Sequence, residues 1–164
     1  MVPPALTYRA RLRTEGLALA TCGVTGSVVL LLADSRATQN AGSTVGQLVV
    51  VLVLLAVLGP LSVRRAIARS KPAGAGPVAA TGEPTPLWHL PLVVAALTLP
   101  LVALGAWDAG LRVTGGCTLV GLAQALLLVR VVYADERATG RTYVRASGSR
   151  ILRGTRLAHV QSRA

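Results

Sequence analysis

Residues 87–133 read LWHLPLVVAALTLPLVALGAWDAGLRVTGGCTLVGLAQALLLVRVVY, and this stretch decides the fold. It contains two apolar segments, 87–107 and 111–133, which only Asp108, Ala109 and Gly110 separate. Each segment has the ~20 residues that a helix needs to cross the hydrocarbon layer of a membrane. Because three residues leave no slack, the two helices must fold back as antiparallel neighbours. The stretch therefore predicts a transmembrane helical hairpin.

Two further apolar segments, 16–33 and 44–63, precede this hairpin and are joined by a short polar connection. The basic residues before the first segment would also suit a signal peptide. However, the apolar run is longer than is usual for a signal peptide, and Asp34 fits poorly in a cleavage site. We therefore expect an uncleaved first span. The predicted fold is an all-α integral membrane protein with four transmembrane helices, arranged as two antiparallel hairpins.

The chain carries a formal net charge of +11, which in a soluble protein would suggest nucleic-acid binding. The positions of the charges argue against that. Fifteen of the seventeen basic residues lie before the first span, between the second and third spans, or from Arg130 onward. Only Arg36 and Arg112 lie near the other two connections. This asymmetry predicts that both termini are cytoplasmic. The abundance of Arg, Ala, Gly, Val and Pro is typical of GC-rich bacteria and favours a bacterial plasma membrane.

The connection between the two hairpins is long and poor in apolar residues. From Lys71 to Pro86 it is dense in Pro, Gly and Ala, with Glu83 as its single acid. Such a composition cannot offset the entropy of ordering its backbone, so we expect a flexible cytoplasmic linker. The predicted organisation is a basic N-terminus (1–15), a first hairpin (16–63), a linker (64–86), a second hairpin (87–133) and a basic cytoplasmic tail (134–164).

Small and polar residues form a stripe on each of two spans. Gln124 is the one strongly polar side chain near the middle of an apolar segment, and small or hydroxyl-bearing residues share its helical stripe. In the first span, Ala18, Cys22 and Gly26 have the small-xxx-small spacing that lets helices approach closely. We favour helix packing over a polar substrate path, because one amide and a few hydroxyls are few for a path. The candidate residues are Thr114, Cys117, Thr118, Gly121, Gln124, Cys22, Thr25 and Gly26.

The sequence lacks the motifs that carry common chemistries. No acid lies inside an apolar segment, which argues against a proton-coupled carrier. There is no phosphate-binding glycine loop, no nucleophile elbow and no zinc-binding helix motif. The expected helix positions place Cys22 and Cys117 at depths that differ by about 12 Å, too far for a disulfide. We therefore expect no catalytic residue, no cofactor and no metal site, and the absence of these motifs favours a protein that is not an enzyme.

The tail after Tyr133 is rich in arginine, and two local structures suit it. Arg137, Arg141 and Arg145 would align on one face of a helix, but residues 142–145 and 150–153 would also suit a small hairpin. Either way, the tail is expected to contact anionic lipid headgroups or an acidic protein partner. Nucleic acid is a weaker candidate because Tyr143 is the tail's only stacking aromatic. The candidate contact residues are Arg137, Arg141, Arg145, Arg150, Arg153 and Arg156.

These observations favour a non-enzymatic accessory or assembly subunit that acts through helix packing and an arginine-rich cytoplasmic tail. The alternative is a small transporter or channel that acts as an oligomer. In that case Gln124, Thr118 and Thr114 would line its path. These residues do not match the motifs of a known family.

Overall fold

A computed structural model describes residues 7–34, 41–72, 87, 89–145 and 157–161. The helices are α1 (Tyr8–Ala33), α2 (Ala41–Ala68), α3 (His89–Ala103), α4 (Trp107–Ala123), the π-helical segment η2 (Gln124–Leu128) and α5 (Val129–Thr139). The strands are β1 (Lys71–Pro72), β2 (Arg141–Arg145) and β3 (Leu157–Gln161). The helical character that the sequence predicts is confirmed. Three helices, α1, α2 and the continuous helix from α4 to α5, are long and apolar enough to cross a membrane, whereas α3 has 15 residues.

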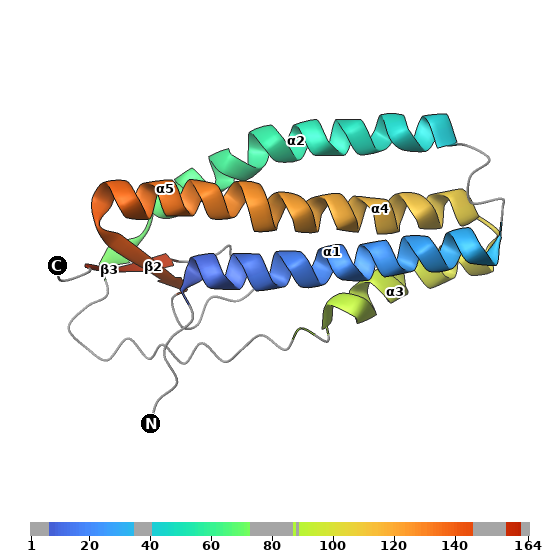
Figure 1. Ribbon diagram of the computed structural model, residues 1–164, viewed down its shortest axis with the longest axis horizontal. Helices are drawn as coiled ribbons and strands as arrows, with labels where there is room; N and C mark the ends of the chain where they lie inside the picture. Colours follow the sequence, from blue (N-terminus) through green and yellow to red (C-terminus); the bar gives the residue numbers. More distant parts are fainter. Residues whose placement is uncertain (1–6, 35–40, 73–86, 88, 146–156, 162–164) are drawn as a thin grey trace, which may run out of the picture.

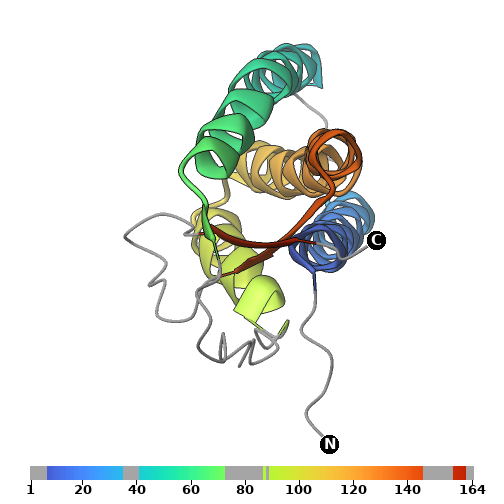
Figure 2. The same cartoon turned by 90° about the vertical axis from the view of Figure 1, so that its left-hand side faces the viewer.

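The helices run alternately up and down, and α4 lies at their centre (Figures 1 and 2). We call the end of the bundle that carries the strands the sheet end, and the opposite end the far end. α4 contacts α1, α2 and α3, and α1 packs most extensively on α4. The sequence predicts α1 and α2 as hairpin neighbours, but α4 lies between them (Figure 1). The reason is that glycines of α1 face α4. Glycines permit closer packing than the branched side chains of α2.

The turn between α3 and α4 lies earlier than the predicted turn at residues 108–110. Gly105 adopts a left-handed conformation (φ 75°), and the amide of Ala106 donates to the carbonyl of Leu101 at 2.8 Å. Asp108 instead lies in the first turn of α4, where a carboxylate is stabilised by the positive end of the helix dipole. It also accepts a hydrogen bond from Arg112 one turn later, at 2.9 Å. The third helix is consequently shorter than the predicted span of 87–107.

α1 and α2 extend beyond the apolar segments predicted for them. α1 begins at Tyr8 rather than at residue 16, and the hydroxyl of Thr7 accepts the amide of Ala10 at 3.3 Å. A hydroxyl in this position satisfies an amide that the helix itself leaves unpaired. α2 continues past Pro60 to Ala68, so residues 64–68, predicted as part of the linker, are helical. Basic helical turns therefore project from the apolar part of the bundle at the sheet end.

A small three-stranded sheet lies across the sheet end (Figure 2). β3 is its central strand, antiparallel to β2 and parallel to β1, with Tyr143 opposite His159. α5 ends at Thr139 because Gly140 takes a left-handed conformation (φ 64°). The helical option for Arg137, Arg141 and Arg145 is therefore wrong. A strand at 142–145 is confirmed, but its partner is β3, and residues 150–153 lie outside the described residues.

The buried apolar core lies at the sheet end, where α1, α2, α5 and β2 meet. It consists of Leu12, Val63, Val132 and Tyr143, of which Val132 and Tyr143 are 0% and 1% exposed. Along the rest of the long helices, many leucine and valine side chains are about half exposed or more. The far end thus depends on close contacts between helices, whereas the sheet end has a core of side chains.

Candidate functional site

The contact between α1 and α4 is made by backbone against backbone. Gly16, Ala20 and Gly23 are buried on one face of α1. Gly16 and Ala20 meet Gly121, and Gly23 meets Thr114 and Thr118. A Cβ atom added to Gly23 would lie 2.6 Å from the carbonyl oxygen of Thr114. One added to Gly121 would lie 2.5 Å from the carbonyl oxygen of Gly16. We call this contact the glycine seam, because only a residue without Cβ fits at these positions.

The hydroxyl groups along the glycine seam are satisfied inside the bundle. Ser27 Oγ donates to Thr114 Oγ1 at 2.8 Å, and this bond links α1 to α4. Thr114 Oγ1 in turn donates to the carbonyl oxygen of Leu111 at 3.1 Å. The Thr114 side chain is fully buried, with 0% exposure. Thr118 Oγ1 donates to the carbonyl of Thr114 at 3.0 Å. The bond from Ser27 therefore joins the two helices, whereas the bonds from Thr114 and Thr118 to carbonyls satisfy these hydroxyls within α4.

The structure brings together some of the residues predicted for packing and not others. Thr114, Thr118 and Gly121 lie in the glycine seam, and Gly26 lies beside it, with a Cβ position 2.8 Å from Thr114 Cγ2. Thr25 is exposed. On α1 the contact face is formed by glycines and alanine at Gly16, Ala20 and Gly23, which the sequence argument missed in favour of Ala18 and Cys22. Weighting glycine above alanine and cysteine would have selected the correct face.

The two free cysteines, Cys22 and Cys117, lie at similar depths in the bundle. Gly23 packs against Thr118, and Cys22 and Cys117 each precede one of these residues. In the antiparallel pair the two cysteines therefore lie only about 3 Å apart along the helix axes. The predicted depth difference of about 12 Å is therefore wrong. It assumed that α1 begins at residue 16 and α4 at residue 111, whereas both helices begin earlier.

Gln124 is half-buried and begins the π-helical segment η2. A π-helical turn contains an extra residue, so it changes the face that the following residues present. At this point Gly16 of α1 approaches closely, because a Cβ there would lie 2.8 Å from the amide of Ala125. Hydrophobic periodicity gives no sign of such an insertion.

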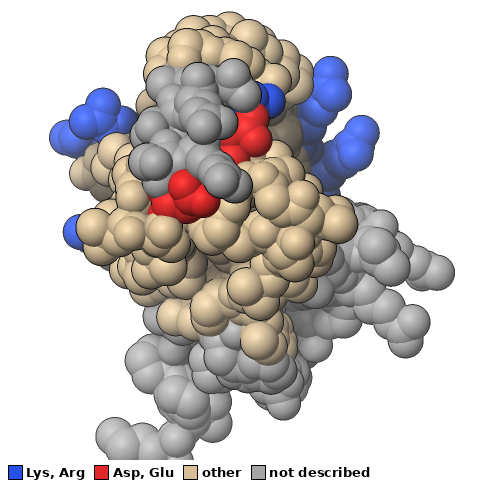
Figure 3. Space-filling view, turned by 90° about the vertical axis from the view of Figure 1, so that its right-hand side faces the viewer, with Lys and Arg blue, Asp and Glu red and all other residues tan. Residues whose placement is uncertain are grey.

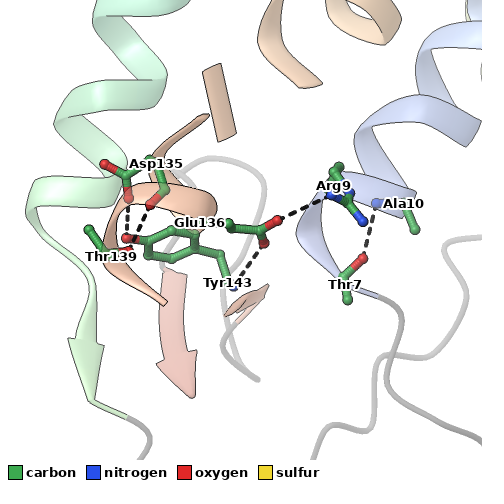
Figure 4. Close-up of polar contacts among 7 residues, drawn as sticks. All are labelled: Thr7, Arg9, Ala10, Asp135, Glu136, Thr139 and Tyr143. Atoms are coloured by element: carbon green, nitrogen blue, oxygen red, sulfur yellow. Dashed lines mark hydrogen bonds and ion pairs between the residues drawn. The ribbon is translucent and has the colours of Figure 1, made fainter. Parts of the chain in front are cut away.

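A polar cluster joins the sheet to the helices, and it consists of Arg9, Asp135, Glu136 and Tyr143 (Figure 4). The phenol of Tyr143 donates to Asp135 Oδ2 at 2.5 Å, and the amide of Tyr143 donates to Glu136 Oε1 at 3.2 Å. Glu136 also pairs with Arg9 of α1 at 3.7 Å. This cluster therefore ties the start of α1, the end of α5 and β2 to one another.

Two further interactions strengthen the sheet end. Burial raises the pKa of the Tyr143 phenol above its usual value, and the hydrogen bond to Asp135 raises it further, so the group stays a proton donor. The ring of His159 lies 3.2 Å from Ser70 Oγ and links β3 to the end of α2. Ser70 and His159 are 89 positions apart in the chain, so only the fold brings them together.

Among the described residues of the sheet end, two open clefts can be defined. The larger lies between α2 and α5 and has a volume of about 680 Å³; we call it the α2–α5 cleft. It is lined by Arg64, Ile67, Ala68, Arg130, Val131, Ala134, Asp135 and Ala138. The smaller, of about 570 Å³, lies along the first turns of α1 and includes Arg9 and Arg13.

The far end carries an ion pair that also contacts α2. Asp108 and Arg112 form an ion pair at 2.9 Å, and Arg112 Nε donates to the buried hydroxyl of Thr44 at 3.4 Å, which joins α2 to α4. Acidic side chains are visible on this end face (Figure 3). Among the described residues, the basic side chains are concentrated at the sheet end instead.

The arginines predicted to contact lipid or a partner are only partly described. Arg137 of α5 and Arg141 of β2 are exposed, and Arg145 ends β2. Arg150, Arg153 and Arg156 lie outside the described residues. No group of three or more His, Cys, Asp or Glu side chains that could hold a metal ion occurs in the described part of the chain.

Comparisons with known proteins give no further guide to function. No protein-family model matches this chain, and no curated protein or solved structure is significantly similar to it. The function must therefore be argued from the glycine seam and the sheet end alone.

Proposed function

We propose that this chain is an integral membrane protein of the bacterial plasma membrane, with both termini cytoplasmic, that acts as a non-enzymatic accessory or assembly subunit. The exposed leucine and valine side chains of the long helices suit contact with lipid. The concentration of arginines at the sheet end suits a cytoplasmic location for that end. α3, although short, completes an even number of crossings.

The single observation that carries this proposal is the glycine seam. Backbone atoms of α1 and α4 leave no space for a side chain between them at Gly23 and Gly121. The hydroxyls that would line a path are bonded inside this contact. The surface suited to interaction is instead the sheet end, where Arg137 and Arg141 are exposed. An acidic surface of another membrane protein, or anionic headgroups, would complement it.

The membrane orientation is tested by cysteine labelling in a variant that lacks Cys22 and Cys117. Ser43→Cys at the far end should react with an impermeant maleimide on intact cells, because this residue is exposed. Val160→Cys on β3, which is 45% exposed, should react only after the cells are permeabilised. The reverse pattern would overturn the orientation.

The subunit role is tested by recovering bound proteins in mild detergent. The double variant Arg137→Gln/Arg141→Gln should lose its partner. Arg13→Gln/Arg65→Gln removes the same charge from exposed residues of α1 and α2, outside the tail, and should keep it. Truncation after Asp135 is a poor test, because it would also remove Tyr143 from the core. Unchanged recovery with the first variant would reject the role assigned to the tail.

Gln124→Leu separates this role from the transporter alternative. A subunit should keep its partner after this change, because Gln124 lies away from the sheet end. Loss of a measurable flux by a variant that remains folded would favour the transporter.

A further inference from the structure

The α2–α5 cleft combines apolar walls with two arginines from different helices. Arg64 belongs to α2 and Arg130 to α5, and both are exposed. Among the described residues, neither guanidinium pairs with a carboxylate. Two arginines that share a cleft and outnumber its single carboxylate are suited to an anion.

Both arginines lie where the apolar surface of their helix ends. Residues 41–63 contain no charged side chain before Arg64, and residues 113–129 contain none before Arg130. In the proposed orientation, both side chains therefore lie at the level of the lipid phosphates on the cytoplasmic side. This placement favours a lipid over a free anion as the occupant.

The charges of the cleft indicate which headgroup suits it. Asp135 also lines the cleft, and its carboxylate accepts the phenol of Tyr143. Two arginines and one aspartate sum to +1, which one phosphodiester neutralises. A zwitterionic headgroup would leave the positive charge of the cleft uncompensated. Apolar lining residues, such as Ile67 and Val131, would contact the glycerol and the first methylenes of the acyl chains.

We propose that the α2–α5 cleft binds a monoanionic phospholipid with an uncharged polar headgroup, of the phosphatidylglycerol type, with its phosphate between Arg64 and Arg130. This inference rests on the proposed membrane location. The lipid would also hold α2 in place. Of the described residues of α2, only Thr44 and Val63, near its two ends, are buried, so this helix is the least embedded of the long helices.

The test measures lipid retained by the full chain in mild detergent, by native mass spectrometry, with added phosphatidylglycerol or phosphatidylethanolamine. The wild type should retain phosphatidylglycerol about tenfold better than phosphatidylethanolamine. Arg64→Gln/Arg130→Gln should weaken retention of phosphatidylglycerol by about tenfold or more. The matched control is Arg65→Gln/Arg69→Gln, which removes the same charge from the same end of α2 outside the cleft. It should stay within about twofold of the wild type.

Several outcomes would overturn the proposal. These are equal retention of the two lipids, undiminished retention by Arg64→Gln/Arg130→Gln, equal loss in the control, or displacement of the lipid by millimolar inorganic phosphate. Arg64→Lys/Arg130→Lys controls for a folding defect, because it keeps the charge and should retain most of the phosphatidylglycerol.

Carbonate extraction of the membranes is measured in parallel. A chain released by carbonate would contradict the membrane location itself, whereas a retained chain without lipid preference would contradict only the cleft.

Discussion

At the scale of single residues, the glycines of α4 differ sharply in what surrounds them. Gly121 lies in the glycine seam, whereas a Cβ added to Gly116 would meet nothing within 4 Å. Both residues belong to the same helix, so they have the same helix propensity. The pair therefore separates the effect of close packing from that of backbone entropy.

Gly121→Ala should lower the stability of the protein, and Gly116→Ala should not. The added methyl group at Gly121 would force α1 and α4 apart, at a cost of ~1–3 kcal/mol. At Gly116 the same change should be neutral or should stabilise by up to ~1 kcal/mol, because alanine favours the helix. Thermal unfolding in detergent micelles measures both. Equal effects in the two variants would contradict the seam.

Tyr143 is buried in the core of the sheet end, and its ionisation should therefore affect stability. A pKa raised above that of an unfolded tyrosine means that the folded state favours the neutral phenol. The contribution of Tyr143 to stability should thus be complete below pH ~10 and be lost as the pH rises through the raised pKa. Absorbance at 295 nm should show a late-titrating component, which Tyr143→Phe removes. Removal of an early-titrating component instead would contradict this assignment.

Tyr143→Phe should also loosen the sheet at neutral pH. The variant leaves the Asp135 carboxylate without the phenol that donates to it, at a cost of ~1–3 kcal/mol. Arg141→Gln is the control, because it alters an exposed side chain on the same strand. Limited proteolysis after Arg137 or Arg141 should be faster in the Tyr143 variant than in wild type. The Arg141→Gln variant lacks the cleavage site at residue 141. The rate of proteolysis of this control is therefore compared with wild type at Arg137 only.

At the scale of elements, α1 and α4 form the closest helix pair of the molecule. The bond from Ser27 to Thr114, at 2.8 Å, defines which turns of the two helices face each other. Thr25, two residues earlier in the chain, is exposed and lies on another face of α1. This difference allows the register of the pair to be tested directly.

A disulfide should form readily in Ser27→Cys/Thr114→Cys, made without Cys22 and Cys117. Oxidation followed by trypsin should leave the two helices joined on a non-reducing gel. Thr25→Cys/Thr114→Cys should form little of this product. Comparable yields from the two pairs would mean that the register is different.

At the scale of the whole molecule, the strongest helix contact joins the two halves of the chain. α1 lies in the first half and α4 in the second, and the sheet also combines β1 with β2 and β3. The chain is therefore a single folding unit and not two hairpins that pack independently. If these contacts are enough to hold the two halves together, the halves should still associate when the chain is divided between them.

Fragments 1–79 and 80–164, expressed together, should co-purify from detergent. Gly23→Val in the first fragment should abolish this association, because the side chain would collide with backbone atoms of α4. Gly46→Val is the control in the same fragment, since a Cβ there meets nothing within 4 Å. Association that survives Gly23→Val would show that the glycine seam does not hold the halves together.

The sequence by itself determined the helical character, the approximate course of each helix and the separation of charge between the two ends. These follow from apolar runs and charged residues that lie next to each other in the chain. It also proposed Thr114, Thr118 and Gly121 as candidates for packing or for a path, because small residues at helical spacing permit close approach. The structure places these three residues in the contact between α1 and α4.

Only the tertiary structure decided which helices touch and what the tail becomes. Contact between α1 and α4 depends on Gly16 meeting Gly121 and on Gly23 meeting Thr114 and Thr118. A sequence does not indicate which residues a glycine will contact. The sheet joins residues near position 71 to residues near position 158, and Arg64 and Arg130 line the same cleft between α2 and α5. Such neighbours are set by steric fit and hydrogen bonding across long chain separations, which local periodicity cannot express.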